Sequence, residues 1–151
     1  MASIQGAVFT HTNLIARDWK RLAAFYRDLF GCEPVPPERD LSGPWLEAGT
    51  GVPGAHLRGI HLRLPGAGGP TLEIFQYDSS PDARPPQAND AGFTHIAFRV
   101  EDLEAAIAAV LLAGGTRVGE LVSREVPGVG TLAFAYVRDP EGNIVELQRW
   151  R

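Results

Sequence analysis

Length, composition and charge already exclude several classes of protein: the 151-residue chain has room for one domain or two packed half-domains, and its 44% hydrophobic content is ordinary for a globular protein. A net charge of −4 provides no basic surface for nucleic acid, and no apolar stretch approaches the ~20 residues that a membrane span needs. The first residues show no secretory pattern and the chain has a single cysteine, so we expect a cytoplasmic protein without an internal disulfide.

The first half of the chain is predicted to contain one helix among several strands. Residues 7–16 are expected to form a strand, and residues 18–30 a helix that Gly31 ends, because apolar residues recur there at helical spacing. Residues 33–56 are rich in proline and glycine, which predicts a loop with a short strand around Trp45–Ala48. Two further strands and the turn between them are expected at Leu57–Leu64, Thr71–Tyr77 and residues 66–70.

The second half repeats this order after a proline-rich linker at residues 78–91. The predicted elements are a strand at 93–100, a helix at 101–113 ended by Gly114-Gly115, and strands at 116–122, 131–138 and 144–149. We therefore expect an α+β fold in which two βαβββ modules, residues 1–77 and 92–151, form one compact domain. Its sheet should be cupped and mostly antiparallel, with the helices outside.

Two segments look like copies of each other. Phe9-Thr10-His11 and Phe93-Thr94-His95 are each followed, seven residues after the histidine, by an aspartate and an amphipathic run. Each half also places a glutamate on a later strand, at Glu73 and Glu146. A repeat that supplies one histidine and one glutamate from each half predicts one metal ion held between two modules.

Strand parity supports this interpretation. Successive side chains of a strand point to opposite faces, so Leu72 and Ile74 should pack against a helix while Glu73 faces away. The same alternation applies around the other three residues. All four are therefore expected on the face of the sheet that the helices do not cover: His11, Glu73, His95 and Glu146.

Two imidazoles and two carboxylates suit one divalent ion such as Zn, Ni, Co, Mn or Fe. The two carboxylates balance its charge; without an ion they would repel each other. Four protein ligands on an octahedral ion leave two positions, which water or a substrate with vicinal oxygens can fill. Such an ion polarises a carbonyl group, and a nearby glutamate can take a proton from the adjacent carbon.

At these residues the chain resembles the vicinal oxygen chelate superfamily, which includes glyoxalase I, methylmalonyl-CoA epimerase, extradiol dioxygenases, and the fosfomycin and bleomycin resistance proteins. The resemblance extends from about Val8 to Trp150. The motifs that carry it are Phe9-Thr10-His11 with Asp18 and Phe25-Tyr26, Leu72-Glu73, residues 92–98, and residues 139–147, which read Asp-Pro-Glu-Gly-Asn-Ile-Val-Glu-Leu.

The resemblance implies a function through the fourth ligand, Glu73. Glyoxalase I and the epimerase have a ligand at this place, whereas the extradiol dioxygenases and fosfomycin enzymes use two histidines and one glutamate. The pattern thus favours a lyase or isomerase, with Glu146 as the base by similarity to glyoxalase I and Glu73 as its partner across the substrate. The alternatives are an Fe(II) extradiol-type dioxygenase and a non-catalytic protein that binds a drug or another small molecule.

Other residues receive lesser roles. His61 and Arg63 share the face of Glu73 and are candidates for substrate binding, although a structural role fits them equally. Cys32 is expected to be buried and not catalytic, and Gly128-Val129-Gly130 to be a hairpin turn. We also expect a homodimer, whose modules pair either within one chain or across two.

Overall fold

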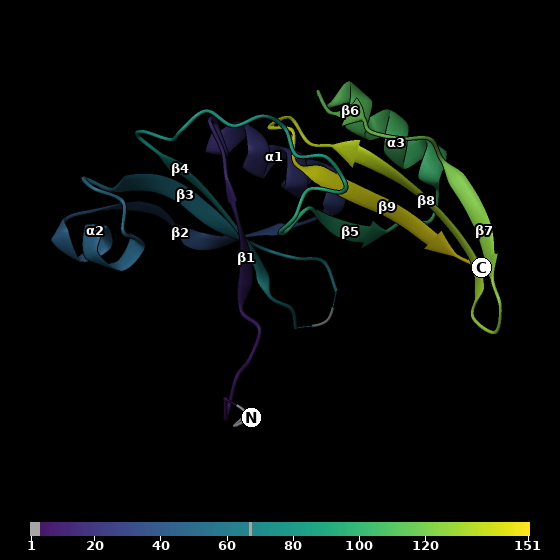
Figure 1. Cartoon of the computed structure of the whole chain (residues 1–151), viewed down its shortest axis with the longest axis horizontal. Coiled ribbons are helices and arrows are strands. Elements are labelled where there is room, and N and C mark those ends of the chain that lie inside the picture. The colour runs from purple at the N-terminus through teal and green to yellow at the C-terminus, as the bar shows by residue number, and fades with distance from the viewer. Residues whose placement is uncertain (1–3, 67) are drawn as a thin grey trace. The chain divides into compact units, whose positions relative to one another are not determined.

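The structure is a computed structural model that describes residues 4–66 and 68–151 (Figure 1). Residue 67 of the expected turn at 66–70 lies outside the described residues. The chain divides into two compact units, Met1–Ser80 and Pro81–Arg151. Within the described residues, three helices and two mixed sheets confirm the α+β expectation. None of the helices in the described part of the chain is both long and apolar enough to cross a membrane.

The first unit contains a four-stranded sheet in the order β1-β4-β3-β2. Strand β1 runs parallel to β4, and the other neighbours are antiparallel. The elements are β1 (His11–Ile15), α1 (Trp19–Phe30), β2 (Glu33–Ser42), α2 (Pro44–Thr50), β3 (His56–Arg63) and β4 (Thr71–Tyr77). Because β1 and β4 are adjacent, residues about 60 positions apart in sequence become neighbours.

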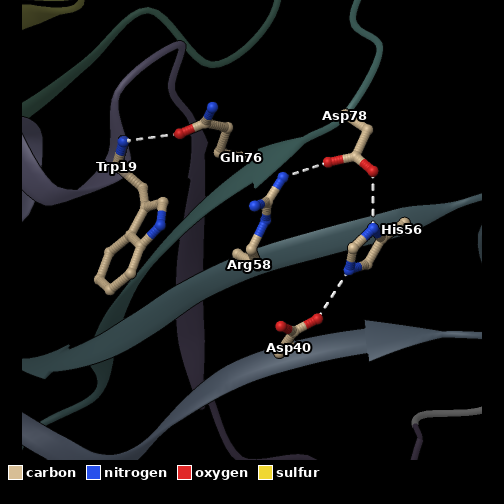
Figure 2. Close-up of polar contacts among 6 residues, drawn as sticks. All are labelled: Trp19, Asp40, His56, Arg58, Gln76 and Asp78. Carbon is tan, nitrogen blue, oxygen red and sulfur yellow. Dashed lines mark hydrogen bonds and ion pairs between the residues drawn. The ribbon is translucent and has the colours of Figure 1, made fainter.

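Helix α1 forms where the sequence predicts it. The side chain of Asp18 caps its N-terminus by accepting from the Arg21 backbone N–H, and Gly31 ends it in the left-handed conformation with a φ of 67°. The Trp19 backbone N–H donates to the side chain of Gln76 on β4 at 3.2 Å (Figure 2). The core on this side of the sheet consists of fully buried apolar residues: Leu22, Tyr26, Leu62, Leu72 and Ile74. The helix thus covers one face of the sheet, and the opposite face carries Glu73 and His61 as well as a smaller apolar cluster formed by Leu46, Leu57 and Phe75.

The expectation for residues 33–56 was wrong. Instead of a loop, residues 33–42 form β2, and instead of a strand, Trp45–Ala48 lies within α2. Strand β2 is at the edge of the sheet, and its pairing with β3 shifts between Val35 and Arg39. Edge strands and irregularities in pairing are the places where a sheet tolerates proline. Helix α2 begins with Pro44 and sits at one end of β2 and β3 (Figure 1).

The second unit contains a five-stranded sheet in the order β5-β9-β8-β6, with β7 also paired to β8. Strand β5 is parallel to β9, as β1 is to β4. The elements are β5 (His95–Arg99), α3 (Leu103–Leu112), β6 (Thr116–Arg117), β7 (Val122–Val126), β8 (Gly130–Arg138) and β9 (Ile144–Trp150). Helix α3 is capped by Asp102 and lies along β8 and β9 (Figure 1).

The second module also differs from expectation in one segment. The strand expected at 116–122 is limited to Thr116–Arg117, and a separate strand, β7, follows at Val122–Val126. The hairpin turn expected around residues 128–130 is confirmed, because Val126 pairs with Gly130 at the end of β7 and β8. The βαβββ order therefore holds with one added helix in the first unit and one added strand in the second.

Candidate metal-binding half-sites and their comparisons

In the first unit, His11 and Glu73 lie on neighbouring parallel strands. His11 is opposite Thr71 in the register and Asn13 is opposite Glu73, so all four share one face of the sheet. The Nε2 atom of His11 is 3.8 Å from Oε1 of Glu73. The Glu73 side chain is 14% exposed, whereas that of His11 is 43% exposed. The parity predicted from the sequence thus places both side chains on the face that α1 does not cover.

Glu73 has two further partners that hold its carboxylate. The Nε2 atom of His61 lies 2.9 Å from Oε2, and Asn13 Nδ2 donates to Oε1 at 2.9 Å. The other ring nitrogen of His61 lies 3.1 Å from the Thr71 hydroxyl. Burial lowers the pKa of His61, and the negative charge of Glu73 only partly opposes that shift. Of the two candidates for substrate binding, His61 contacts Glu73 directly, whereas Arg63, on the same face, is exposed at the end of β3.

The second unit builds a matching pair on β5 and β9. Nε2 of His95 is 3.1 Å from Oε2 of Glu146, whose side chain is 15% exposed. Glu146 is opposite Ala97 on β5 and Tyr136 on β8. The rings of His95 and Tyr136 are 5.1 Å apart between centroids. Burial raises the pKa of Tyr136, and the charge of Glu146 adds to the increase.

The turn before β9 fixes the position of Glu146. Asp139 is 3% exposed, and its carboxylate accepts hydrogen bonds from the backbone N–H groups of Glu141 and Asn143 at 2.9 and 3.0 Å. The side-chain amide of Asn143 donates to the other oxygen at 2.8 Å. Gly142 adopts a φ of 93°, which favours glycine. The turn that the sequence motif predicted is therefore a closed network that sets where β9 begins.

Both histidines have the partner that a metal ligand needs at its second ring nitrogen. The Thr10 hydroxyl is 3.2 Å from Nδ1 of His11, and the Thr94 hydroxyl is 3.3 Å from Nδ1 of His95. Each hydroxyl can accept the Nδ1 proton, which leaves Nε2, the atom nearest the glutamate, to bind a metal. These threonines belong to the repeated Phe-Thr-His motif, so the repeat supplies both the ligand and its orienting group.

The distances within each pair fit two ligands of one ion. Donor atoms about 2.1 Å from a shared ion are about 3.0 Å apart at right angles and at most about 4.2 Å apart. The separations of 3.1 and 3.8 Å fall in this range. Among residues 4–66 and 68–151, no group of three or more His, Cys, Asp and Glu side chains is arranged to hold a metal. Each unit thus presents a half-set of ligands, and the joining of the two half-sets stays a prediction.

A second charged cluster lies on the opposite face of the first sheet (Figure 2). His56 is the last residue of the segment 33–56 that was expected to be a loop, but it begins β3 and places its two ring nitrogens 2.6 Å from Asp40 and 2.6 Å from Asp78. Arg58 also pairs with Asp78. The hydrogen bonds to Asp40 and then Asp78 raise the pKa of His56. The cluster connects β2, β3 and the residue after β4, and we assign it to stability.

Cys32 is buried, as the sequence predicts, with 1% of its surface exposed. Burial raises the pKa of its thiol to about 11, so the thiolate is scarce at neutral pH. Asn13 was not identified from the sequence, although it lies two residues after His11 on the same face of its strand. Its parity was the one signal that could have indicated it.

Comparisons with known proteins bear on the family and the fold of the chain. The family model described as Glyoxalase/Bleomycin resistance protein/Dioxygenase superfamily matches residues 8–147. A search of curated proteins returned no match.

Solved structures that are similar to this chain include a glyoxalase family protein from Bacillus cereus. It is 18% identical in sequence, with a TM-score of 0.82 and coverage of 99% of each chain. A glyoxalase family protein from Enterococcus faecalis is 26% identical, with a TM-score of 0.60 and coverage of 96% of this chain and 99% of that one. A glyoxylase/bleomycin resistance protein/dioxygenase domain from Frankia is 18% identical, with a TM-score of 0.58 and coverage of 99% and 100%.

Proposed function

The chain belongs to the Glyoxalase/Bleomycin resistance protein/Dioxygenase superfamily, and on that premise we propose that it is a metal-dependent lyase or isomerase. Its substrate would be a small molecule with vicinal oxygens, and the reaction would move a proton on the carbon next to a carbonyl group. The observation that supports this most is the presence, in each unit, of a histidine and a glutamate paired on adjacent parallel strands.

In this proposal four side chains hold one divalent ion: His11, Glu73, His95 and Glu146. A bound ion would draw electron density from a carbonyl oxygen and make the neighbouring C–H bond more acidic. Zn, Ni, Co, Mn and Fe all suit two imidazoles and two carboxylates. The fourth protein ligand favours proton transfer over oxygen chemistry, because it occupies a position that oxygen would need.

The protein's own groups divide the work of moving the proton. The Glu146 carboxylate would accept the proton from carbon, and His95 Nε2, 3.1 Å from it, would bind the same ion beside it. Both glutamates are mostly shielded from solvent, with side-chain exposures of 14% and 15%, which strengthens their electrostatic interactions with a bound molecule. General-base catalysis of this kind contributes roughly 10²–10⁴-fold to a rate.

Proton exchange with solvent tests the proposal. Metal-loaded protein should be incubated in deuterated water with a panel of α-carbonyl compounds, and product or recovered substrate should carry deuterium at the carbon next to the carbonyl. Glu146→Gln should abolish that exchange while a chelating substrate analogue still binds, and its metal content should be measured in parallel.

Other outcomes identify the alternatives. Oxygen consumption matched one-to-one with product would support a dioxygenase, whereas stoichiometric binding without turnover or metal would support a small-molecule binding protein. A homodimer is part of the proposal and is tested by light scattering of the purified chain.

A further inference from the structure

We propose that Asn13 and His61 are positioning residues that hold the carboxylate of Glu73 in one orientation, so that the two glutamates differ in mobility and therefore in role. This inference rests on the proposed function. It assigns Glu73 as the fixed ligand and leaves Glu146 as the carboxylate that can turn away to accept a proton.

The contacts around Glu73 occupy both of its carboxylate oxygens. Asn13 Nδ2 donates to Oε1 at 2.9 Å and also approaches the Glu73 backbone carbonyl at 3.4 Å, so one amide grips the residue at two points. His61 Nε2 meets Oε2 at 2.9 Å. The opposite ring nitrogen of His61 faces the Thr71 hydroxyl at 3.1 Å, so the imidazole is held between two residues of β4. Rotation of the Glu73 carboxylate would break bonds on both sides.

The second unit lacks this support at the positions that correspond by strand register. Glu73 is opposite one residue of β1 and one of β3, and Glu146 is likewise opposite one residue of β5 and one of β8. The corresponding residues in the second unit are Ala97 for Asn13, Tyr136 for His61 and Ile144 for Thr71. An alanine and an isoleucine have no side-chain hydrogen-bonding group. Within the described part of that unit, His95 is the one hydrogen-bonding or ion-pair partner of the Glu146 carboxylate.

This asymmetry explains how two similar half-sites can act differently. A carboxylate with bonds on both oxygens is preorganised as a ligand, whereas one with a single partner can exchange that partner for a proton on substrate. His61 and Asn13 act through Glu73 and need not touch the substrate. Their removal should therefore weaken metal binding before it changes the chemical step.

The first part of the test uses metal-free protein, so that it does not depend on activity. At about pH 8, above the ordinary imidazole pKa of about 6.5, nitrogen NMR of the histidine rings should show His61 with its proton on Nε2. Glu73→Gln should shift the signals of the His61 ring and the Asn13 amide. Glu146→Gln should leave both unchanged.

The second part measures the affinity for Zn²⁺ and Ni²⁺ by competition with a chelator. His61→Phe keeps a ring of similar shape but removes the donor, and should weaken binding by about 10- to 100-fold, as loss of a group that orients a ligand does. His61→Gln retains a donor and should recover much of the loss. Asn13→Leu should weaken binding in the same direction. His56→Phe, the same change on the opposite face of β3, is the matched control and should leave affinity at the parent value.

The outcomes separate the inference from the function on which it rests. If His61 carries its proton on Nδ1, or if His61→Phe binds both metals as the parent does, the positioning role is wrong even where the parent exchanges deuterium. If the parent binds neither metal and exchanges no deuterium, the proposed function fails, and the contacts around Glu73 lose their assigned role with it. Agreement of the NMR, the affinities and the glutamine rescue supports the inference.

Discussion

Replacing Asp139 by alanine should destabilise the second unit and displace the strand that carries Glu146. The Asp139 carboxylate is 3% exposed and accepts three hydrogen bonds, from two backbone N–H groups and the Asn143 amide. Hydrogen bonds to a charged group are worth about 1.5–3 kcal/mol each, but three on one carboxylate do not add independently. Glu141 and Asn143 are half-buried, so water can reach part of what is lost. We expect a loss of about 3 kcal/mol of unfolding free energy.

Urea unfolding measures this change through the transition midpoint, with the slope unchanged if only stability is affected. Asp139→Asn, which keeps the shape but loses the charge, should cost about 1 kcal/mol. Glu120→Ala removes the same charge from an exposed position of the same unit and should change stability by less than about 0.5 kcal/mol. If Asp139→Ala unfolds within about 0.5 kcal/mol of the parent, the turn does not have the anchoring role assigned to it.

Three further outcomes follow from individual contacts. A Cβ on Gly59 would lie 2.0 Å from the Ile74 carbonyl oxygen, so Gly59→Ala should push β3 from β4 and cost at least about 1–3 kcal/mol in urea unfolding; parental stability would contradict the register. Cys32→Ser should keep full turnover with any substrate found, because its buried thiol has a pKa of about 11; loss of activity in a folded variant would assign Cys32 a role. The stability difference between parent and His56→Gln should be largest between about pH 4 and 6.5. Above this range the stability difference should shrink, because the pKa of His56 is raised in the folded protein and its stabilising effect is lost as the imidazole loses its proton. Below this range the difference should shrink as Asp78, whose pKa is lowered, becomes protonated. A stability difference that grows above pH 7 would contradict this account.

The sequence predicted the elements whose local signals and tertiary roles agree. Helix α1 has both a capping aspartate and a terminal glycine, and β4 was predicted with its observed bounds, Thr71–Tyr77. Strand β2 was missed because its prolines at positions 34, 36 and 37 normally argue against a strand. They are accommodated because β2 is an edge strand with a shift in its pairing, and both facts depend on the sheet order, not on local sequence.

In the candidate site too, some features follow from the local sequence and others depend on how the strands pair. Alternation along a strand was enough to place His11 with Glu73 and His95 with Glu146 on the faces that α1 and α3 do not cover. The contact of His61 with Glu73 required the β3–β4 register, which pairs these residues directly, and the role of Asn13 required the β1–β4 register. A single sequence indicates which face of a strand a residue lies on, but not which residue of the neighbouring strand it pairs with. The groups that support Glu73 could therefore be identified only from the structure.

The ion content of the purified protein and its ligand variants tests the central claim most directly. Parent protein loaded with Zn²⁺ and freed of excess ion should retain one ion per chain. Single replacements of His11, Glu73, His95 and Glu146 by alanine should each lose most of it, because ligands in both units are assigned to one ion. Retention of the parental ion content in both His11→Ala and His95→Ala would contradict a shared site.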